Sequence, residues 1–388
     1  MRSVKWFMPF VFTMIVWLGS LSHPAAWGQS TGPRAAPQEL PAGNSGPGAK
    51  QSPAAKPVLS PADQSIKEAY TKSKTAESVD DFSQIISQCQ DGIEQGASAD
   101  NTAYAKKLQA WAYNKRGEKY VAEDEKAALK DFDSAAALDP TYWRALHNRG
   151  VSRAASGDAK GAQADFDAVI RMNPNYANAW FNRGELKSGK NDFAGALDDY
   201  NRAVQLQPSD PGFYCSRGHA KYHLGRVNEA MADYNRAVQL EPNNALWLVD
   251  RGDGYREQGL YQPAAADYRE AIRIDPKLGR AYLGAAWLMA TCPDARFRET
   301  DKAISAAQKA IDLDGDKDYR YLDTLAAAQA NAGQFEAAKK SANLALGAAP
   351  PKETSKIRQR LDLYEGGRAY REGGPAEPVR SASAIRTP

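Results

Sequence analysis

Cysteine and histidine are scarce in this chain, which has three Cys and four His among its 388 residues. The cysteines, Cys89, Cys215 and Cys292, are far apart and odd in number, so they do not form the framework of a disulfide-stabilised protein. No CxxC pair and no Cys/His spacing typical of a zinc finger occurs. The stability of the fold therefore cannot rest on cross-links.

An excess of charge of one sign is also lacking. The chain has 50 Lys and Arg against 47 Asp and Glu, which gives a formal net charge of +3. This balance lacks the basic footprint of a nucleic-acid-binding protein, so we predict no nucleic acid partner. Apolar residues make up 43% of the chain, which is enough for a substantial core.

Catalytic motifs are missing as well. The sequence contains no HExxH, no GxSxG, no phosphate-cradling glycine loop and no kinase-like set of motifs. Without a converging set of reactive groups, we predict that the protein is not an enzyme and uses no cofactor.

The segment 1–28 differs in character from the rest of the chain. Arg2 and Lys5 give a basic start, and Phe7 to Leu21 is a mostly apolar run of roughly 15 residues. Residues 26–28 (AWG) supply a small-x-small cleavage pattern. We predict a cleaved signal peptide over residues 1–28 and an exported protein, periplasmic or secreted. The alternative is a retained anchor, in which case this segment alone would contact the membrane.

Two further segments are rich in Pro, Ala, Gly and Ser and poor in large apolar side chains. They span residues 29–65 and 373–388. Such segments cannot bury enough surface to offset the cost of ordering the chain, so we predict a flexible tether and a disordered tail.

Between these segments the sequence repeats itself at a constant interval. DYNRAVQLQP at 199–208 returns as DYNRAVQLEP at 233–242. Proline, glycine, alanine and an aromatic residue keep the same phase, at Pro140, Pro174, Pro208, Pro242 and Pro276; Gly150, Gly184, Gly218 and Gly252; Ala162, Ala196, Ala230 and Ala264; Phe132, Phe166, Tyr200, Tyr234 and Tyr268. A period of about 34 residues is typical of helix–turn–helix units, in which two helices of about 12–14 residues and two turns fill the interval. The small residues let the two helices approach closely, and the aromatic side chain fills the space beside them.

These units resemble tetratricopeptide repeats. One unit carries the family pattern at Trp180, Gly184, Ala196, Tyr200, Ala203 and Pro208, and the resemblance covers roughly 109–350. It implies an all-α, right-handed superhelical α-solenoid of about seven units with a C-terminal capping helix. The C-terminal units are similar to those of exported bacterial members of the family. The expected divisions are N-terminal helices of a degenerate repeat at 66–108, units at 109–142, 143–176, 177–210, 211–244, 245–278, 279–315 (with a loop insertion) and 316–350, and a cap at 351–372.

The chain departs from the family where a leucine usually precedes the glycine. Arginine stands there instead, and an aspartate recurs at a fixed distance after it: Arg149, Arg183, Arg217 and Arg251; Asp165, Asp199, Asp233 and Asp267. We predict a ladder in which each Arg stem packs and its guanidinium pairs with the Asp. The alternative is a row of solvated arginines.

The resemblance implies a non-catalytic scaffold that binds a protein or peptide in the concave groove lined by the first helix of each unit. By position, the candidate groove residues are Asn148, Asn182, Glu185, Ser216, His219, Asp250 and Asp253. An Asn there holds a peptide backbone in related proteins, because its amide both donates and accepts. The family's clamp for a C-terminal carboxylate is not supported, because its third repeat would need basic residues where Gly212 and Ser216 stand. A third interpretation is a structural envelope component that uses its convex face or its termini.

One first helix carries Cys215, His219 and His223 at intervals of four residues, on a single face. A His pair at this spacing can bind a divalent metal, so a metal- or small-ligand-responsive sensor is the alternative function. Cys215 and His223 are two turns apart, about 12 Å along the axis, so all three cannot share one ion. We therefore predict a binding face and retain His219 and His223 as the metal candidates.

Overall fold

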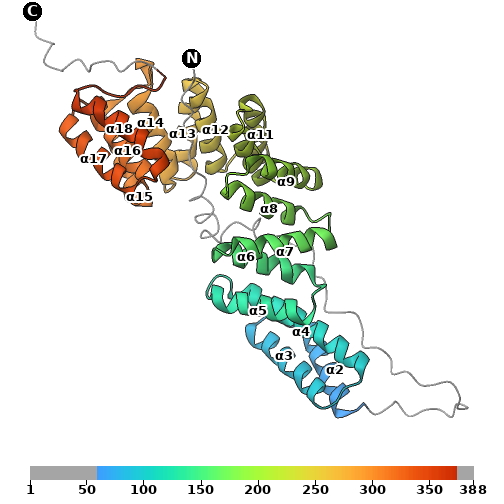
Figure 1. Ribbon diagram of the computed structural model, residues 1–388. Coiled ribbons are helices and arrows are strands. Elements are labelled where there is room, and N and C mark those ends of the chain that lie inside the picture. The colour runs from blue at the N-terminus through green and yellow to red at the C-terminus, as the bar shows by residue number, and fades with distance from the viewer. Residues whose placement is uncertain (1–58, 374–388) are drawn as a thin grey trace, which may run out of the picture. The chain divides into compact units, whose positions relative to one another are not determined.

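The computed structural model describes residues 59–373 of the chain. Over this range the protein is all-helical, with 17 α-helices, one short 3-10 helix and no strand (Figure 1). The predicted all-α helical-repeat fold is therefore confirmed. The helices are α2 (Pro61–Ser73), α3 (Val79–Glu94), α4 (Ala99–Tyr120), α5 (Glu125–Leu138), α6 (Trp143–Ala155), α7 (Ala159–Met172), α8 (Ala177–Gly189), α9 (Phe193–Leu206), α10 (Pro211–His223), α11 (Val227–Leu240), α12 (Ala245–Glu257), α13 (Tyr261–Ile274), α14 (Gly279–Thr291), η1 (Ala295–Phe297), α15 (Thr300–Asp314), α16 (Tyr319–Asn331), α17 (Phe335–Ala348) and α18 (Pro351–Glu365).

The predicted signal peptide (1–28), the tether up to residue 58 and the tail from residue 374 lie outside the described residues. Within the described range, no helix combines the length and the apolar character that crossing a membrane requires.

The chain forms two compact parts that divide at Pro208 and Ser209. The N-terminal part comprises α2 to α9, and the C-terminal part comprises α10 to α18. In each part, helices that follow one another in the chain pack side by side as pairs (Figure 1). The first helices of successive pairs also touch: α4 contacts α6 and α6 contacts α8 in one part, and α12 contacts α14 in the other.

In the four pairs from α6/α7 to α12/α13, the turn within the pair contains a residue in the left-handed conformation. Gly157, Gly225 and Gly259 have φ of 88°, 79° and 75°, and Asn191 has φ of 61°. Glycine and asparagine tolerate this conformation at the end of a helix, as the sequence pattern predicted. Helices α7 and α9 then begin at a capping side chain; Asp192, for example, accepts a hydrogen bond from the Gly195 backbone N–H at 3.0 Å.

Close contact within each pair requires the phased glycine. A Cβ atom at Gly184 would lie 2.7 Å from Tyr200 Cε1, and one at Gly150 would lie 2.8 Å from Phe166 Cε1. Both distances are shorter than carbon–carbon contact allows. The first helix can therefore lie directly on the aromatic ring of the second helix only because no side chain intervenes.

Two predicted boundaries at the N-terminal end are corrected. Helix α2 begins at Pro61, inside the segment predicted as tether, because the Ser60 hydroxyl caps the Asp63 backbone N–H and proline suits the first helical position. Helix α4 begins at Ala99 rather than at residue 109, because Tyr104 and Leu108 are buried against the preceding helices.

The C-terminal end contains the predicted loop and cap. The insertion between α14 and α15 holds η1, and α18 follows the last helix pair. Residues 366–372, predicted as part of the cap, are not helical and return along α14. There the Glu372 backbone N–H donates to the Thr291 carbonyl at 2.9 Å, and Arg371 Nη1 donates to the Ala290 carbonyl at 3.0 Å.

Candidate partner-binding site

An arginine–aspartate ladder joins the two helices of five successive pairs. Arg183 Nε lies 2.9 Å from Asp199 Oδ2, and Arg183 Nη2 lies 2.6 Å from Asp199 Oδ1. The same two-bond contact joins Arg116 to Asp131, Arg149 to Asp165, Arg217 to Asp233, and Arg251 to Asp267. The hydrogen bonds to Asp199 raise the pKa of the Arg183 guanidinium. The pairing predicted from the spacing is present, and it holds these charges inside the fold.

Further charged side chains contact the Arg–Asp pairs, which we call the rungs of the ladder; the Arg183–Asp199 rung is an example. Lys187 Nζ lies 2.8 Å from Asp199 Oδ2, so this aspartate, which is 2% exposed, has two cationic side chains beside it. Arg183 Nη1 also donates to Asp167 Oδ1 of the preceding helix, α7, at 2.7 Å. Arg183 therefore links its own two helices and also the helix pair before them, within the N-terminal part.

A second regular contact fixes three of the predicted groove residues. The buried hydroxyl of Tyr200 donates to Glu185 Oε1 at 2.5 Å, and that of Tyr268 donates to Asp253 Oδ1 at 2.6 Å. Tyr234 Oη lies 3.2 Å from Nδ1 of His219. Burial and the adjacent carboxylates raise the pKa values of Tyr200 and Tyr268, so these hydroxyls keep the proton that they donate.

The pair that has Phe166 in place of the tyrosine has an apolar partner. Val151 stands at the position of Glu185, His219 and Asp253. A phenyl ring supplies no hydroxyl donor; in the pair with Phe132, Glu118 follows the phased glycine and accepts from Asn114 Nδ2 at 2.8 Å instead. The Tyr rings thus hold polar groups of α8, α10 and α12 in fixed orientations on half-buried surface.

In the N-terminal part, the predicted groove residues Asn148 and Asn182 belong to a linear chain of hydrogen bonds. Asn148 Nδ2 donates to Asn114 Oδ1 at 3.0 Å, and Asn114 Nδ2 donates to Glu118 Oε1 at 2.8 Å. Asn182 Nδ2 lies 3.0 Å from His147 Nε2, and His147 Nδ1 lies 3.4 Å from Asn148 Oδ1. Asn114 is 0% exposed and Asn148 6%, whereas Asn182 is half-buried.

His147 sets the direction of this chain. Burial lowers its pKa to about 4, so the ring is neutral at pH 7. With Asn182 donating to Nε2, the proton sits on Nδ1 and is donated to Asn148. Every bond then points toward the Glu118 carboxylate, and of the two predicted Asn residues only Asn182 presents an accessible edge.

In the C-terminal part, Asp250 is the centre of a buried polar cluster. It is 5% exposed; Cys215 Sγ lies 2.9 Å from its Oδ2, and His219 Nε2 lies 3.5 Å from the same oxygen. Arg280 Nη2 donates to Oδ1 at 2.7 Å. Burial raises the pKa of Asp250, but the charges of Arg280 and His219 outweigh it and hold the pKa below its usual value.

The seven predicted groove residues therefore fall into two classes. Asn148 and Asp250 are buried within the hydrogen-bond chain and the polar cluster. The other five are half-buried on the first helices: Asn182 and Glu185 in the N-terminal part, and Ser216, His219 and Asp253 in the C-terminal part. We call the first helix of each pair its A helix, and these five residues form the A-helix faces, one in each part.

Sequence reasoning missed His147 and Arg280. Arg280 shares its repeat position with Arg144, Asn178, Gly212 and Leu246, so the repeat pattern did not mark it as the partner of Asp250. His147 directly precedes Asn148, but nothing in the sequence marked it as the bridge to Asn182.

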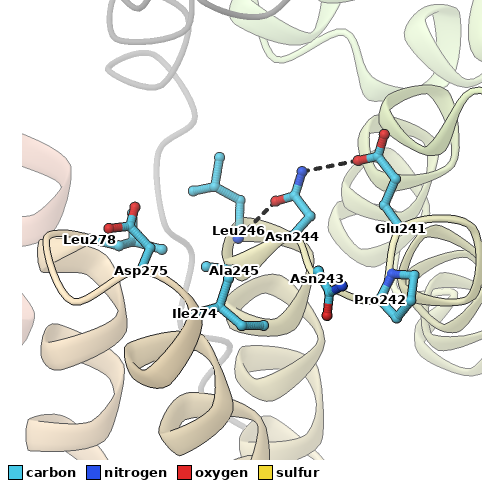
Figure 2. Close-up of a pocket in the computed structure, with 9 residues that line it drawn as sticks. All are labelled: Glu241, Pro242, Asn243, Asn244, Ala245, Leu246, Ile274, Asp275 and Leu278. Atoms are coloured by element: carbon cyan, nitrogen blue, oxygen red, sulfur yellow. Dashed lines mark hydrogen bonds between the residues drawn. The ribbon is translucent and has the colours of Figure 1, made fainter.

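A shallow depression of about 560 Å³ lies beside the turns that precede α12 and α14 (Figure 2). Its polar groups already have roles. Asn244 caps α12 by accepting from the Leu246 backbone N–H at 3.0 Å, and it donates to Glu241 Oε2 at 3.0 Å. The depression is therefore a by-product of the turns and offers no converging set of polar groups.

Comparison with known proteins supports the repeat assignment. Residues 147–211, 212–244 and 248–278 match the tetratricopeptide repeat family. A search of curated proteins gave no match. Among solved structures, the APC/C hetero-tetramer Cut9–Hcn1 is similar with a TM-score of 0.54 and 15% identity, over 77% of this chain and 55% of that chain.

Two further similar structures are smaller proteins. MamA from Desulfovibrio magneticus RS-1 has a TM-score of 0.40 and 20% identity, over 43% of this chain and 95% of its own. YrrB, described as a TPR protein with an unusual peptide-binding site, has a TM-score of 0.40 and 20% identity, over 50% of this chain and 95% of its own. At such identities the similarity concerns the fold.

Proposed function

We propose that this chain, which is a tetratricopeptide-repeat protein, is a non-catalytic scaffold that binds a protein or peptide partner on its A-helix faces. Proteins built from these repeats generally act as interaction scaffolds, and solenoids bind along extended faces of stacked helices. The observation that carries the proposal is the set of tyrosine-anchored polar groups at one repeat position, Glu185, His219 and Asp253.

Anchoring favours binding because it lowers the entropy lost on association. A Glu or Asp side chain that is already held by a tyrosine hydroxyl gives up less conformational freedom when a partner docks. The charges at Glu185 and Asp253 are negative, so they favour partner segments with backbone N–H groups or basic side chains turned toward them.

The ladder arginines have a different role in this proposal. Arg183 and its equivalents are paired with buried aspartates, so they hold the repeats together and do not recruit an acidic partner. Partner choice is then assigned to Asn182, Glu185, Ser216 and Asp253, which vary between repeats while the ladder stays constant.

The test compares two matched triple variants with the parent in affinity capture. Glu185→Gln, Ser216→Arg and Asp253→Asn change the A-helix faces while keeping an acceptor for each tyrosine. The control, Asp198→Asn, Gln205→Arg and Glu270→Gln, makes the same charge changes on second helices, at two exposed positions and one half-buried position. Both must retain the helical circular dichroism of the parent.

We expect the parent and the control to capture the same partner, and the A-helix variant to lose it. Retention by the A-helix variant with loss by the control would contradict the proposal. That outcome would favour a component that uses its convex face.

We further propose that the protein works in the bacterial cell envelope after export. The basic start, apolar run and AWG motif of residues 1–28 support this location. Cell fractionation with intact-mass analysis tests it. Export predicts an envelope protein lacking residues 1–28, and a full-length protein in the cytoplasm would contradict it.

A further inference from the structure

Helices α10 and α12 bring together a thiol, an imidazole and a carboxylate. Cys215 and His219 are four residues apart on α10 and so share one face, and Asp250 approaches from α12. The possible ligand atoms of these three side chains all lie within 4.8 Å of one another. His223, the second candidate from the sequence, does not belong to this group, and Asp250 takes its place.

We propose that Cys215, His219 and Asp250 bind one zinc-class divalent cation. Thiolate sulfur, imidazole nitrogen and carboxylate oxygen are the three ligand types that zinc accepts, and three protein ligands leave a fourth position for water or a ligand. In a tetrahedral site with the usual bond lengths, neighbouring ligand atoms are about 3.3–3.7 Å apart. The 3.5 Å from His219 Nε2 to Asp250 Oδ2 already lies in this range, and the 2.9 Å from Cys215 Sγ to the same oxygen needs a small outward shift.

Two further residues orient the ligands, as outer groups do in metal sites. The Tyr234 hydroxyl lies 3.2 Å from His219 Nδ1 on the side of the ring away from Asp250, so Nε2 faces the cation position. Arg280 holds Asp250 Oδ1 at 2.7 Å and leaves Oδ2 directed at Cys215 and His219.

The charges of the site balance when the cation enters. Cys215 releases its thiol proton to solvent, so thiolate and Asp250 together supply two negative charges for a dication. The positive charge of Arg280 is balanced by Asp253, whose Oδ2 lies 3.7 Å from Arg280 Nη2. Cys215 and Asp250 are buried, whereas the His219 side chain is 21% exposed, so the cation would enter beside His219.

The test uses the full chain without an affinity tag, freed of metal by a chelator and dialysis. Calorimetric titration with Zn²⁺ gives stoichiometry and affinity, and Co²⁺ gives a spectrum that reports thiolate and tetrahedral ligation. We expect one ion per chain and a sulfur-to-cobalt charge-transfer band.

Cys215→Ser should abolish that band and weaken Zn²⁺ binding at least tenfold, and Asp250→Asn should weaken it similarly. Tyr234→Phe, which removes only the orienting hydroxyl, should weaken it by roughly 10-fold. His223→Ala, on the same helix, and Cys292→Ser, a second buried cysteine, are controls that should bind as the parent does.

A parent that binds no Zn²⁺ would overturn the proposal. So would equal affinity in the parent, Cys215→Ser and Asp250→Asn, because the ion would then lie elsewhere. If Asp250→Asn fails to fold, the cobalt spectra of the parent and Cys215→Ser decide. Capture of a protein partner does not enter this test, so the metal site and the scaffold function can fail independently.

Discussion

The Arg183–Asp199 rung should contribute a large coupling energy, which a double-mutant cycle measures. The perturbations are Arg183→Ala, Asp199→Ala and the double substitution. Asp199 is 2% exposed and accepts two bonds from Arg183, at 2.9 Å and 2.6 Å. Removing one partner of a buried pair costs about 3–5 kcal/mol, because the other charge stays buried.

Two features place this rung at the lower end of that range. Lys187 still faces Asp199 when the arginine is gone, and the Arg183 side chain is 18% exposed to water. We expect each single substitution to cost about 3 kcal/mol and the double substitution about 4 kcal/mol, which gives a coupling energy of about 2 kcal/mol.

Urea unfolding followed by circular dichroism gives the four stabilities. Hydrogen exchange then locates the change, because repeat proteins open in parts, and the loss should concentrate in α8 and α9. The matched control is Arg202→Ala with Asp198→Ala on the surface of α9, where each change should cost under about 0.5 kcal/mol and the two should add. A coupling energy for Arg183 and Asp199 below about 0.5 kcal/mol would refute the ladder as a stabilising device.

Three further predictions concern packing, buried polar groups and pH. Gly184→Ala should destabilise by about 1–3 kcal/mol, since its Cβ would meet Tyr200 at 2.7 Å. Gly347→Ala, with open space around it, should stabilise α17 by roughly 0.5–1 kcal/mol, and denaturation midpoints that do not separate the two variants would contradict the packing account. Asn148→Ala should cost about 1–3 kcal/mol by leaving Asn114 Oδ1 and His147 Nδ1 without a partner, whereas Ser216→Ala should be neutral. Equal melting temperatures for the two variants would contradict a stabilising role for this hydrogen-bond chain. Burial, with the nearby Glu372 carboxylate, raises the pKa of Glu257 from 4.5 to about 8, so the folded chain binds this proton more tightly than the unfolded chain. Stability should therefore fall as pH rises from 4.5 to about 8, and Glu257→Gln should flatten that slope in urea titrations; an unchanged slope would show that other groups set it.

The repeat positions could be predicted from sequence because each acts within its own helix pair. Gly184 and Tyr200 meet inside one unit, as do Arg183 and Asp199, so the constant repeat interval reveals both contacts. The left-handed turn residue, Asn191, follows from the same logic, because few residue types tolerate its φ of 61°.

Contacts between successive pairs could not be predicted in the same way. His147 bridges Asn148 and Asn182 only because α6 and α8 lie side by side, and the repeat pattern does not record which polar groups then meet. Asp250 was assigned to the groove for the same reason. Its carboxylate pairs with Arg280 of α14, and the same repeat position holds Leu246, Gly212, Asn178 and Arg144 in earlier units, so the repeat pattern does not fix an arginine there.

The most direct test of the scaffold function is site-specific photo-cross-linking in cells. A photoreactive amino acid is placed at Asn182 or Ser216 on the A-helix faces, and at Gln205 or Gln239 on exposed surfaces of second helices. The account predicts that the same partner is cross-linked from Asn182 or Ser216 and not from Gln205 or Gln239. Cross-linking only from Gln205 or Gln239 would contradict it and assign binding to the second helices.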